Sequence, residues 1–420
     1  MAVFDQTVLE NGLVLVGDRL PHVRSCTVGC WVRVGSMNEL PEENGLTHMV
    51  EHMVFKGTSS RSARDIAEEM DMVGGQINAF TGKDCTCYYA KVMDGDLPLA
   101  VDILSDLALN PLFEESEFQK ERGVVLEEIA MVEDTPEDLA HELHAEVQFS
   151  GSLRRPILGT KEQIMAYSRD TLMGYWKQRY VPGSMVMSIA GNYNWDLFVE
   201  LCRTRFGAAE GVPPGPSHGA QAVVSGRKAR EKDTEQVHIC LGYPGLPLGD
   251  EDLFPLSVFS IVLGGGMSSR LFQRIREELG LAYGIYSFIS SYPGCGVLNV
   301  YAGASPDNAE KVVAEIQSIM KALLRDGMTD KEFTCGKAQM RGAYVLGLES
   351  SSARMQTIGR NMLLQNRLYD PDERLRKIDG ITRQDVRRVG EKVLLSIPSA
   401  AVLGKGAERF IKQVGGIANG

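Results

Sequence analysis

Two histidines and a glutamate stand together near the start of the chain, in the order His48-Met-Val-Glu51-His52. On a helix, residues four positions apart leave the same face about one turn apart, so the imidazoles of His48 and His52 can converge on one metal ion. Imidazole nitrogens are common zinc ligands. Glu51 borders the same face, where its carboxylate can reach a water molecule at the metal without binding the metal. This order, His-x-x-Glu-His, is the inverse of the more common zinc-protease pattern His-Glu-x-x-His.

The residues around this motif predict a buried helix. Ionisable side chains are costly to bury without a partner. Two structural histidines and a surface glutamate would be the simpler interpretation, and for a single histidine it would be preferred. Three such residues in this order on an apolar helix favour a metal site instead. The apolar residues that surround them are Leu46, Met49, Val50, Met53, Val54 and Phe55.

A catalytic zinc site needs a third protein ligand and an open position for water. The best candidates are the glutamates of the segment Glu121-Arg-Gly-Val-Val-Leu-Glu127-Glu128. Glu121 and Glu128 are two helical turns apart and share one stripe of a helix, so Glu128 can bind the metal while Glu121 orients the site from behind. Spacing alone also permits Glu127 as the ligand, and an ordinary charged helix face would explain the segment as well.

With these residues the sequence resembles the pitrilysin-like metallopeptidases, the family of mitochondrial processing peptidase and insulin-degrading enzyme. The third zinc ligand of that family follows the second histidine at the separation found between His52 and Glu128, so the resemblance selects Glu128 over Glu127. It spans most of the chain. Its further motifs are Gly74-Gly-Gln-Ile-Asn-Ala-Phe-Thr81, Asp84, Tyr88-Tyr89 and Glu121.

The resemblance implies a role for each part of the site. Glu51 is the general base, Glu121 supports the ligands from behind, and zinc is held by His48, His52 and Glu128. In this family a strand at an open sheet edge near the metal binds the substrate peptide as an added strand. Here that edge comprises Asn78, Ala79, Phe80 and Thr81.

A second motif lies in the C-terminal half. In the family, an arginine and a tyrosine seven residues apart help to bind substrate and to stabilise the transition state. Arg276 and Tyr283 have this spacing and setting. A surface arginine and a core tyrosine would be the alternative interpretation.

The chain has 420 residues, of which 44% are hydrophobic and 24% are charged. This length and composition predict a soluble globular protein of two or three domains. The net charge of −11 argues against nucleic acid as a partner. The N-terminal residues have the pattern of neither a signal peptide nor a presequence, and no apolar run is long enough to span a membrane. Eight scattered cysteines without a Cys-x-x-Cys pair predict reduced thiols in a cytoplasmic protein.

The order of predicted elements repeats in two halves. A strand, an apolar helix and a further strand at 237–243, 255–263 and 283–290 follow the order of the first half without its histidines. We therefore predict an α+β protein of two homologous domains, each an antiparallel-rich β-sheet covered by helices. Residues 1–210 form the zinc-binding domain, residues 211–233 a Pro/Gly-rich linker, and residues 234–420 the domain with Arg276 and Tyr283.

The predicted function is a zinc-dependent endopeptidase that cleaves unfolded peptides or oligopeptides. A processing peptidase specific for one precursor or leader is the alternative, and a catalytically silent partner subunit is a third hypothesis that the intact metal motif disfavours. Large family members hold four such domains in one chain and enclose the substrate. A chain with two domains, resembling mitochondrial processing peptidase subunits, implies a homodimer in which Arg276 and Tyr283 of one subunit serve the zinc of the other.

Overall fold

The computed structural model describes residues 4–215 and 221–414, which form two compact units with one β-sheet each. Within the described residues, unit 1 is drawn from Met1–Ile129, Pro156–Gly219 and Val345–Asp372. Unit 2 is drawn from Ala130–Arg155, Ala220–Tyr344 and Glu373–Gly420. Each unit therefore contains a segment from the opposite half of the sequence.

The sheet of unit 1 has six strands in the order β1-β2-β6-β3-β5-β4. β2 and β6 pair in parallel, and the other neighbours are antiparallel. Seven of the eight residues of β3 are buried, as expected for a central strand with both faces covered. Among the described strands, β4 pairs only with β5 and so forms an edge of the sheet. The strands are β1 (Asp5–Val8), β2 (Val14–Arg19), β3 (Ser25–Val32), β4 (Gln76–Thr81), β5 (Thr86–Met93) and β6 (Met185–Gly191).

Helices of the N-terminal half cover one face of this sheet. The sequence of α3, Leu-Pro-Leu-Ala-Val-Asp-Ile-Leu-Ser-Asp-Leu-Ala-Leu, is apolar on most sides, and the helix packs against β3, β5 and α8. α1 packs against α7 and β4, which places the metal motif beside the open edge. These helices are α1 (Leu46–Val54), α2 (Ala63–Met72), α3 (Leu97–Leu109), α4 (Glu115–Asp134, which continues into unit 2), α6 (Lys161–Ala166), α7 (Arg169–Arg179) and α8 (Trp195–Phe206).

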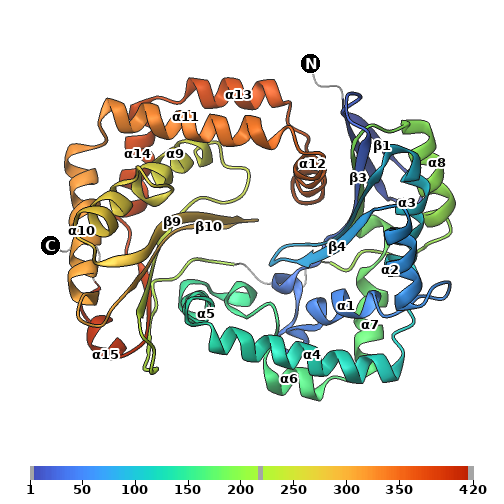
Figure 1. Cartoon of the computed structure of the whole chain (residues 1–420), viewed down its shortest axis with the longest axis horizontal. Coiled ribbons are helices and arrows are strands. Elements are labelled where there is room, and N and C mark those ends of the chain that lie inside the picture. The colour runs from blue at the N-terminus through green and yellow to red at the C-terminus, as the bar shows by residue number, and fades with distance from the viewer. Residues whose placement is uncertain (1–3, 216–220, 415–420) are drawn as a thin grey trace. The chain divides into compact units, whose positions relative to one another are not determined.

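The opposite face of the same sheet is covered by α12 (Ser351–Gln365), which comes from the C-terminal half (Figure 1). Met355, Ile358 and Met362 repeat at helical spacing and are buried in one cluster with Trp31 of β3. The sheet of unit 1 is thus enclosed only when residues far apart in sequence come together.

The sheet of unit 2 repeats this topology. Its order is β7-β11-β8-β10-β9, which matches β2-β6-β3-β5-β4 strand for strand, including the parallel pair β7 and β11. This correspondence supports the predicted internal duplication, and the predicted α+β fold is confirmed. The strands are β7 (Arg227–Arg230), β8 (Val237–Pro244), β9 (Ala282–Tyr292), β10 (Cys295–Ala304) and β11 (Ser399–Leu403).

Unit 2 also has one face covered from the other half of the sequence. α9, α10 and α14 contribute to the large apolar core on one face. α5 (Pro136–Gln148) packs against β8 and β11, where His144 Nε2 lies 3.0 Å from Ser399 Oγ and Gln148 Nε2 donates to Asn299 Oδ1 at 2.5 Å. The remaining helices are α9 (Leu253–Gly264), α10 (Ala309–Asp326), α11 (Asp330–Gly347), α13 (Pro371–Gly380), α14 (Arg383–Leu394) and α15 (Ala407–Phe410).

Two features differ from the sequence predictions. The units exchange residues 130–155 and 345–372, whereas the predicted domains, 1–210 and 234–420, are continuous. Within the predicted linker 211–233, residues 227–230 form the strand β7. Its Arg-Lys-Ala-Arg sequence looks like a solvated loop, but pairing with β11 satisfies its backbone. Residues 216–220 of that linker lie outside the described residues.

All eight cysteines are free thiols, seven of them buried and Cys335 exposed. Among the helices of residues 4–215 and 221–414, none has the length and apolar character needed to cross a membrane.

Candidate metal centre

The start of helix α1 is fixed by a buried carboxylate. Glu39, only 1% exposed, accepts hydrogen bonds from the backbone N–H groups of Thr47 (2.9 Å) and Gly45 (3.0 Å). Burial raises the pKa of Glu39, and these hydrogen bonds oppose the rise. Gly45 has a φ of +95°, and a Cβ there would lie 2.7 Å from the carbonyl oxygen of Leu158. The first turn, which carries His48, is therefore held on both sides.

Three side chains converge between α1 and α4. The Oε2 atom of Glu128 lies 3.6 Å from His48 Nε2 and 3.5 Å from His52 Nε2. One ligand atom of each residue lies within 4.8 Å of the others. Ligands at about 2.1 Å around a tetrahedral zinc ion are separated by roughly 3.4 Å. The two nitrogens and one oxygen therefore fit a zinc ion with one further position open.

Electrostatics favours the form of His48 that binds a metal. Burial, together with the nearby His52, lowers the pKa of His48 to about 3. A metal-binding imidazole must be neutral, so this histidine needs no deprotonation at neutral pH. Its Nδ1 atom is buried without a hydrogen-bond partner among the described residues. The Nε2 atom is the one that faces Glu128.

Glu51 lies next to this group and is held by Thr81 at the end of β4. The Thr81 hydroxyl donates to Glu51 Oε2. Burial raises the pKa of Glu51, and the negative charge of Glu128 adds to the rise, while Thr81 and His52 oppose it. A carboxylate with a raised pKa accepts a proton more readily near neutral pH, which is the property a general base needs.

Glu121 lies behind His52, as its position in the same helical stripe suggests. It is 5% exposed, and its Oε2 atom lies 3.1 Å from His52 Nδ1. Its other oxygen, Oε1, lies 2.7 Å from Lys56 Nζ. Glu127, the alternative ligand by spacing, is exposed and does not belong to the convergent group.

The segment predicted to bind the substrate peptide forms the open edge of the sheet. Asn78, Ala79, Phe80 and Thr81 all belong to β4, which pairs with β5 on one side only. The N–H of Ala79 donates to the side-chain oxygen of Asn78 at 2.8 Å. The Phe80 ring packs edge-on against Trp31, with centroids 5.8 Å apart.

Arg276 and Tyr283 lie close together in unit 2. Arg276 belongs to a short π-helical segment, Phe272–Glu278, and its Nη1 donates to the carbonyl oxygen of Tyr283 at 3.0 Å. The guanidinium also lies over the Tyr283 ring, 4.2 Å from its centroid. The Tyr283 side chain is 75% exposed, which contradicts the alternative of a core tyrosine.

Two residues of this candidate centre, Glu39 and Lys56, were not predicted from the sequence. Glu39 caps α1 from six residues before Gly45, a spacing that no common capping pattern predicts. Lys56 could have been found, because it continues the helical spacing of His48 and His52. Its partner Glu121 is separated from it by 65 positions, and only the fold brings the two together.

The chain is similar to known proteins over most of its length. The family model described as "Insulinase (Peptidase family M16)" matches residues 15–161, and "Peptidase M16 inactive domain" matches residues 166–340. A protein named as an uncharacterized zinc protease in Bacillus subtilis (strain 168) is 42% identical over 384 residues, which cover 89% of this chain and 94% of the relative. The chain belongs to peptidase family M16.

Other members of the M16 family are similar over nearly the whole chain. An uncharacterized zinc protease of Streptomyces coelicolor is 41% identical over 408 residues, covering 95% of this chain and 89% of the relative. The crystal structure of a protease from Helicobacter pylori has a TM-score of 0.90 at 22% identity, covering 96% of this chain and 100% of that one. At this identity the structural likeness concerns the fold alone.

Proposed function

We propose that this M16 protein is a zinc-dependent endopeptidase. The observation that carries the proposal is the convergence of His48, His52 and Glu128 on one point, with the half-buried Glu51 beside them. The names of its relatives as zinc proteases support zinc as the metal. A silent partner subunit would not need this complete set of ligands and base.

In this proposal each residue of the centre has one task. His48, His52 and Glu128 would hold the zinc ion, which supplies Lewis-acid activation of the attacking water and of the scissile carbonyl. Glu51 takes a proton from the water as its oxygen adds to the carbonyl carbon. The same carboxyl group then gives the proton to the amide nitrogen, so that the C–N bond breaks and the amine leaves neutral.

The substrate we propose is an unfolded or flexible peptide. The open edge of β4 supports its addition as an extra strand, held mainly by main-chain hydrogen bonds and therefore tolerant of different side chains. Compact folded proteins would resist cleavage, because their strands are already paired. Nothing in the site favours a single precursor or leader peptide over a range of peptides.

The proposed assembly is a homodimer of the mitochondrial processing peptidase type, in which two chains enclose the substrate. Arg276 and Tyr283 would stabilise the oxyanion that forms on the carbonyl, as the family resemblance implies. The pairing of the Arg276 guanidinium with the exposed Tyr283 supports their acting together. The eight free thiols are in keeping with a reducing compartment, and we propose the cytoplasm.

The test of this function separates metal binding from chemistry. The purified protein should carry about one zinc ion per chain and cleave a quenched-fluorescence reporter peptide. Glu51→Gln should retain the zinc yet reduce cleavage by about 10²- to 10⁴-fold, because the proton acceptor is lost. Glu127→Gln, a change at an exposed glutamate next to a ligand, should leave both unchanged. Normal cleavage by the Glu51→Gln protein would overturn the assignment.

A further inference from the structure

Lys56 and Glu121 form an ion pair directly behind the metal ligand His52. Lys56 lies just beyond the end of α1, four residues after His52, and its Nζ atom is 2.7 Å from Glu121 Oε1. The second oxygen of the same carboxylate, Oε2, is 3.1 Å from His52 Nδ1. We propose that Lys56 is a positioning residue for the zinc site. This inference rests on the proposed function.

The role follows from the two nitrogens of His52. Its Nε2 faces Glu128 at 3.5 Å, so Nε2 must offer its lone pair to the metal and Nδ1 must carry the hydrogen. Glu121 accepts that hydrogen through Oε2 only if the carboxylate keeps its present orientation. Lys56 holds Oε1 and thereby leaves Oε2 directed at His52. Such partners behind a ligand fix the orientation and tautomer of the imidazole.

Among the ion pairs of the described residues, Glu121 takes part in two, with Lys56 and with His52. Its side chain is 6% exposed, so solvent does not compensate its charge, whereas the Lys56 side chain is 32% exposed. Removing the ammonium would leave a buried carboxylate whose one remaining partner, among the ion pairs of the described residues, is the neutral imidazole of His52. The carboxylate would then reorient toward water, and the hydrogen bond to His52 Nδ1 would weaken.

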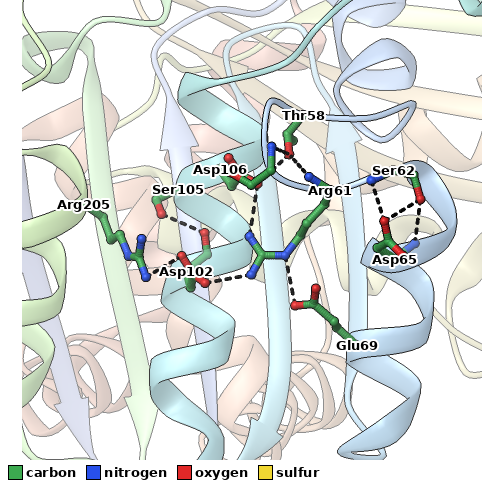
Figure 2. A network of polar contacts seen from close by, with 10 residues as sticks. Thr58, Arg61, Ser62, Asp65, Glu69, Asp102, Ser105, Asp106 and Arg205 are labelled. Carbon is green, nitrogen blue, oxygen red and sulfur yellow. Dashed lines mark hydrogen bonds and ion pairs between the residues drawn. The ribbon is translucent and has the colours of Figure 1, made fainter.

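The loop that carries Lys56 is itself held in place, so the ammonium has a defined position. Figure 2 shows Arg61, which belongs to the same loop, at the centre of a network of polar contacts. Its guanidinium pairs with Asp102 at 2.7 Å, with Asp106 at 3.1 Å and with Glu69 at 2.9 Å. Thr58, two residues after Lys56, also donates to Asp106.

Backbone hydrogen bonds fix the same loop on both sides of Lys56. The N–H of Lys56 donates to the carbonyl oxygen of Met53 at 3.1 Å, and the carbonyl oxygen of Gly57 accepts from Leu112 at 3.1 Å. Because the backbone at Lys56 is already fixed, only the side chain has to be ordered when it binds Glu121, and the loss of conformational entropy is small. The loop therefore holds Lys56 in position to bind Glu121 before the metal arrives, as expected of a residue that supports a metal ligand.

The experiment measures zinc affinity rather than activity alone. Zinc dissociation constants of the full-length protein would be obtained by competition with a fluorescent chelator, with zinc ion itself as the probe. Lys56→Met should weaken zinc binding by about 10- to 100-fold, the range typical for loss of such a partner. Lys56→Arg, which keeps the charge and the donors, should restore most of the affinity. Lys228→Met, which breaks an ion pair with Glu146 in unit 2, is the matched control and should leave the zinc dissociation constant unchanged.

A double substitution separates positioning from general stabilisation. If Lys56 acts through Glu121, then Lys56→Met should add little to the loss caused by Glu121→Gln. Additive losses would overturn the proposal, because Lys56 would then act independently of Glu121. If Lys56→Met does not fold, Lys56→Gln takes its place in the same cycle. A wild-type protein that binds no zinc would refute the proposed function, whereas normal zinc binding by a folded Lys56→Met protein would refute only the role of Lys56.

Discussion

Arg360 of α12 donates a hydrogen bond through Nη2 to Oδ2 of Asp84, in the turn that follows β4. Asp84 is buried, while the Arg360 side chain is 39% exposed. The turn joins β4, whose Thr81 bonds to Glu51, to the strand β5. A residue of the C-terminal half therefore anchors the turn next to the proposed general base. This contact gives Asp84, one of the residues that carry the family resemblance, a structural role.

Loss of this ion pair should destabilise unit 1. Arg360→Met leaves the buried carboxylate of Asp84 without its cation, and we expect a loss of about 1–2 kcal/mol in the free energy of unfolding, a value reduced by the exposure of Arg360. Urea unfolding followed by tryptophan fluorescence measures it, since Trp31, Trp176 and Trp195 all belong to unit 1. Arg203→Met breaks an exposed pair with Glu200 in the same unit and should cost less than about 0.5 kcal/mol. Equal effects of the two changes would contradict this assignment.

A methyl group at Gly359 should separate α12 from the sheet. A Cβ at this position would overlap the buried indole of Trp31 and lie 2.7 Å from Ser188 Oγ. We therefore expect Gly359→Ala to destabilise unit 1 by about 1–3 kcal/mol, with altered tryptophan emission in the folded state. Gly174→Ala in α7 of the same unit is the matched control, because a Cβ there meets nothing within 4 Å and alanine favours the helix. Unchanged stability of Gly359→Ala would mean that α12 does not pack tightly on Trp31.

The packing of α5 should make unit 2 sensitive to acid. Burial, together with the nearby His141, lowers the pKa of His144 to about 3. The unfolded chain takes up this proton near pH 6.5, so the contribution of neutral His144 is complete above pH 6.5 and is lost as the pH falls toward 3. Between pH 7 and pH 5 the loss from this residue is about 2 kcal/mol.

Hydrogen exchange of the amides of β8 and β11 at several pH values measures this loss. His144→Gln cannot take up the proton, so its stability should fall less steeply between pH 7 and pH 5. His22→Gln, at an exposed histidine of unit 1, should follow the wild type. A His144→Gln protein with the wild-type slope would show that another group governs the acid sensitivity of this sheet.

Sharing of sites between two chains should appear as complementation. Glu51→Gln protein and an Arg276→Ala/Tyr283→Phe variant should each be poorly active alone. In a mixed dimer with shared sites, one site carries both defects and the other carries neither, so peptide cleavage should partly return. Activity would be measured after co-expression with two affinity tags and purification through both. A confirmed mixed dimer that remains as inactive as its parents would refute the trans arrangement.

Most residues of the candidate metal centre could be proposed from the sequence because much of their geometry is local. His48, Glu51 and His52 lie within two turns of one helix, and helical periodicity fixes their mutual placement. The proposed third ligand is different, because helical spacing left Glu127 and Glu128 both possible. The resemblance to a family selected Glu128, and the structure brings its carboxylate to the two imidazoles.

The exchange of helices between the units could not be predicted from the sequence. Met355, Ile358 and Met362 mark one apolar face of a helix, but an apolar face does not specify which sheet it covers. The nearest sheet in sequence is that of unit 2, whereas the observed partner, Trp31, is more than 300 positions away. The polar residues His144 and Gln148 of α5 indicate even less clearly which sheet this helix covers. Their partners are single hydrogen-bonding groups on two different strands, Ser399 of β11 and Asn299 of β10.

The exchanged helix α12 also has a consequence for biosynthesis. The last strand of the unit 1 sheet ends at Gly191, but the helix that covers its second face begins 160 residues later, at Ser351. At roughly 5–20 residues per second, a ribosome needs on the order of 10–30 s to make that stretch. During this interval Val16, Trp31 and Val186 of the nascent sheet have no cover from α12. This apolar face of the sheet therefore acquires its covering helix only when translation is nearly complete.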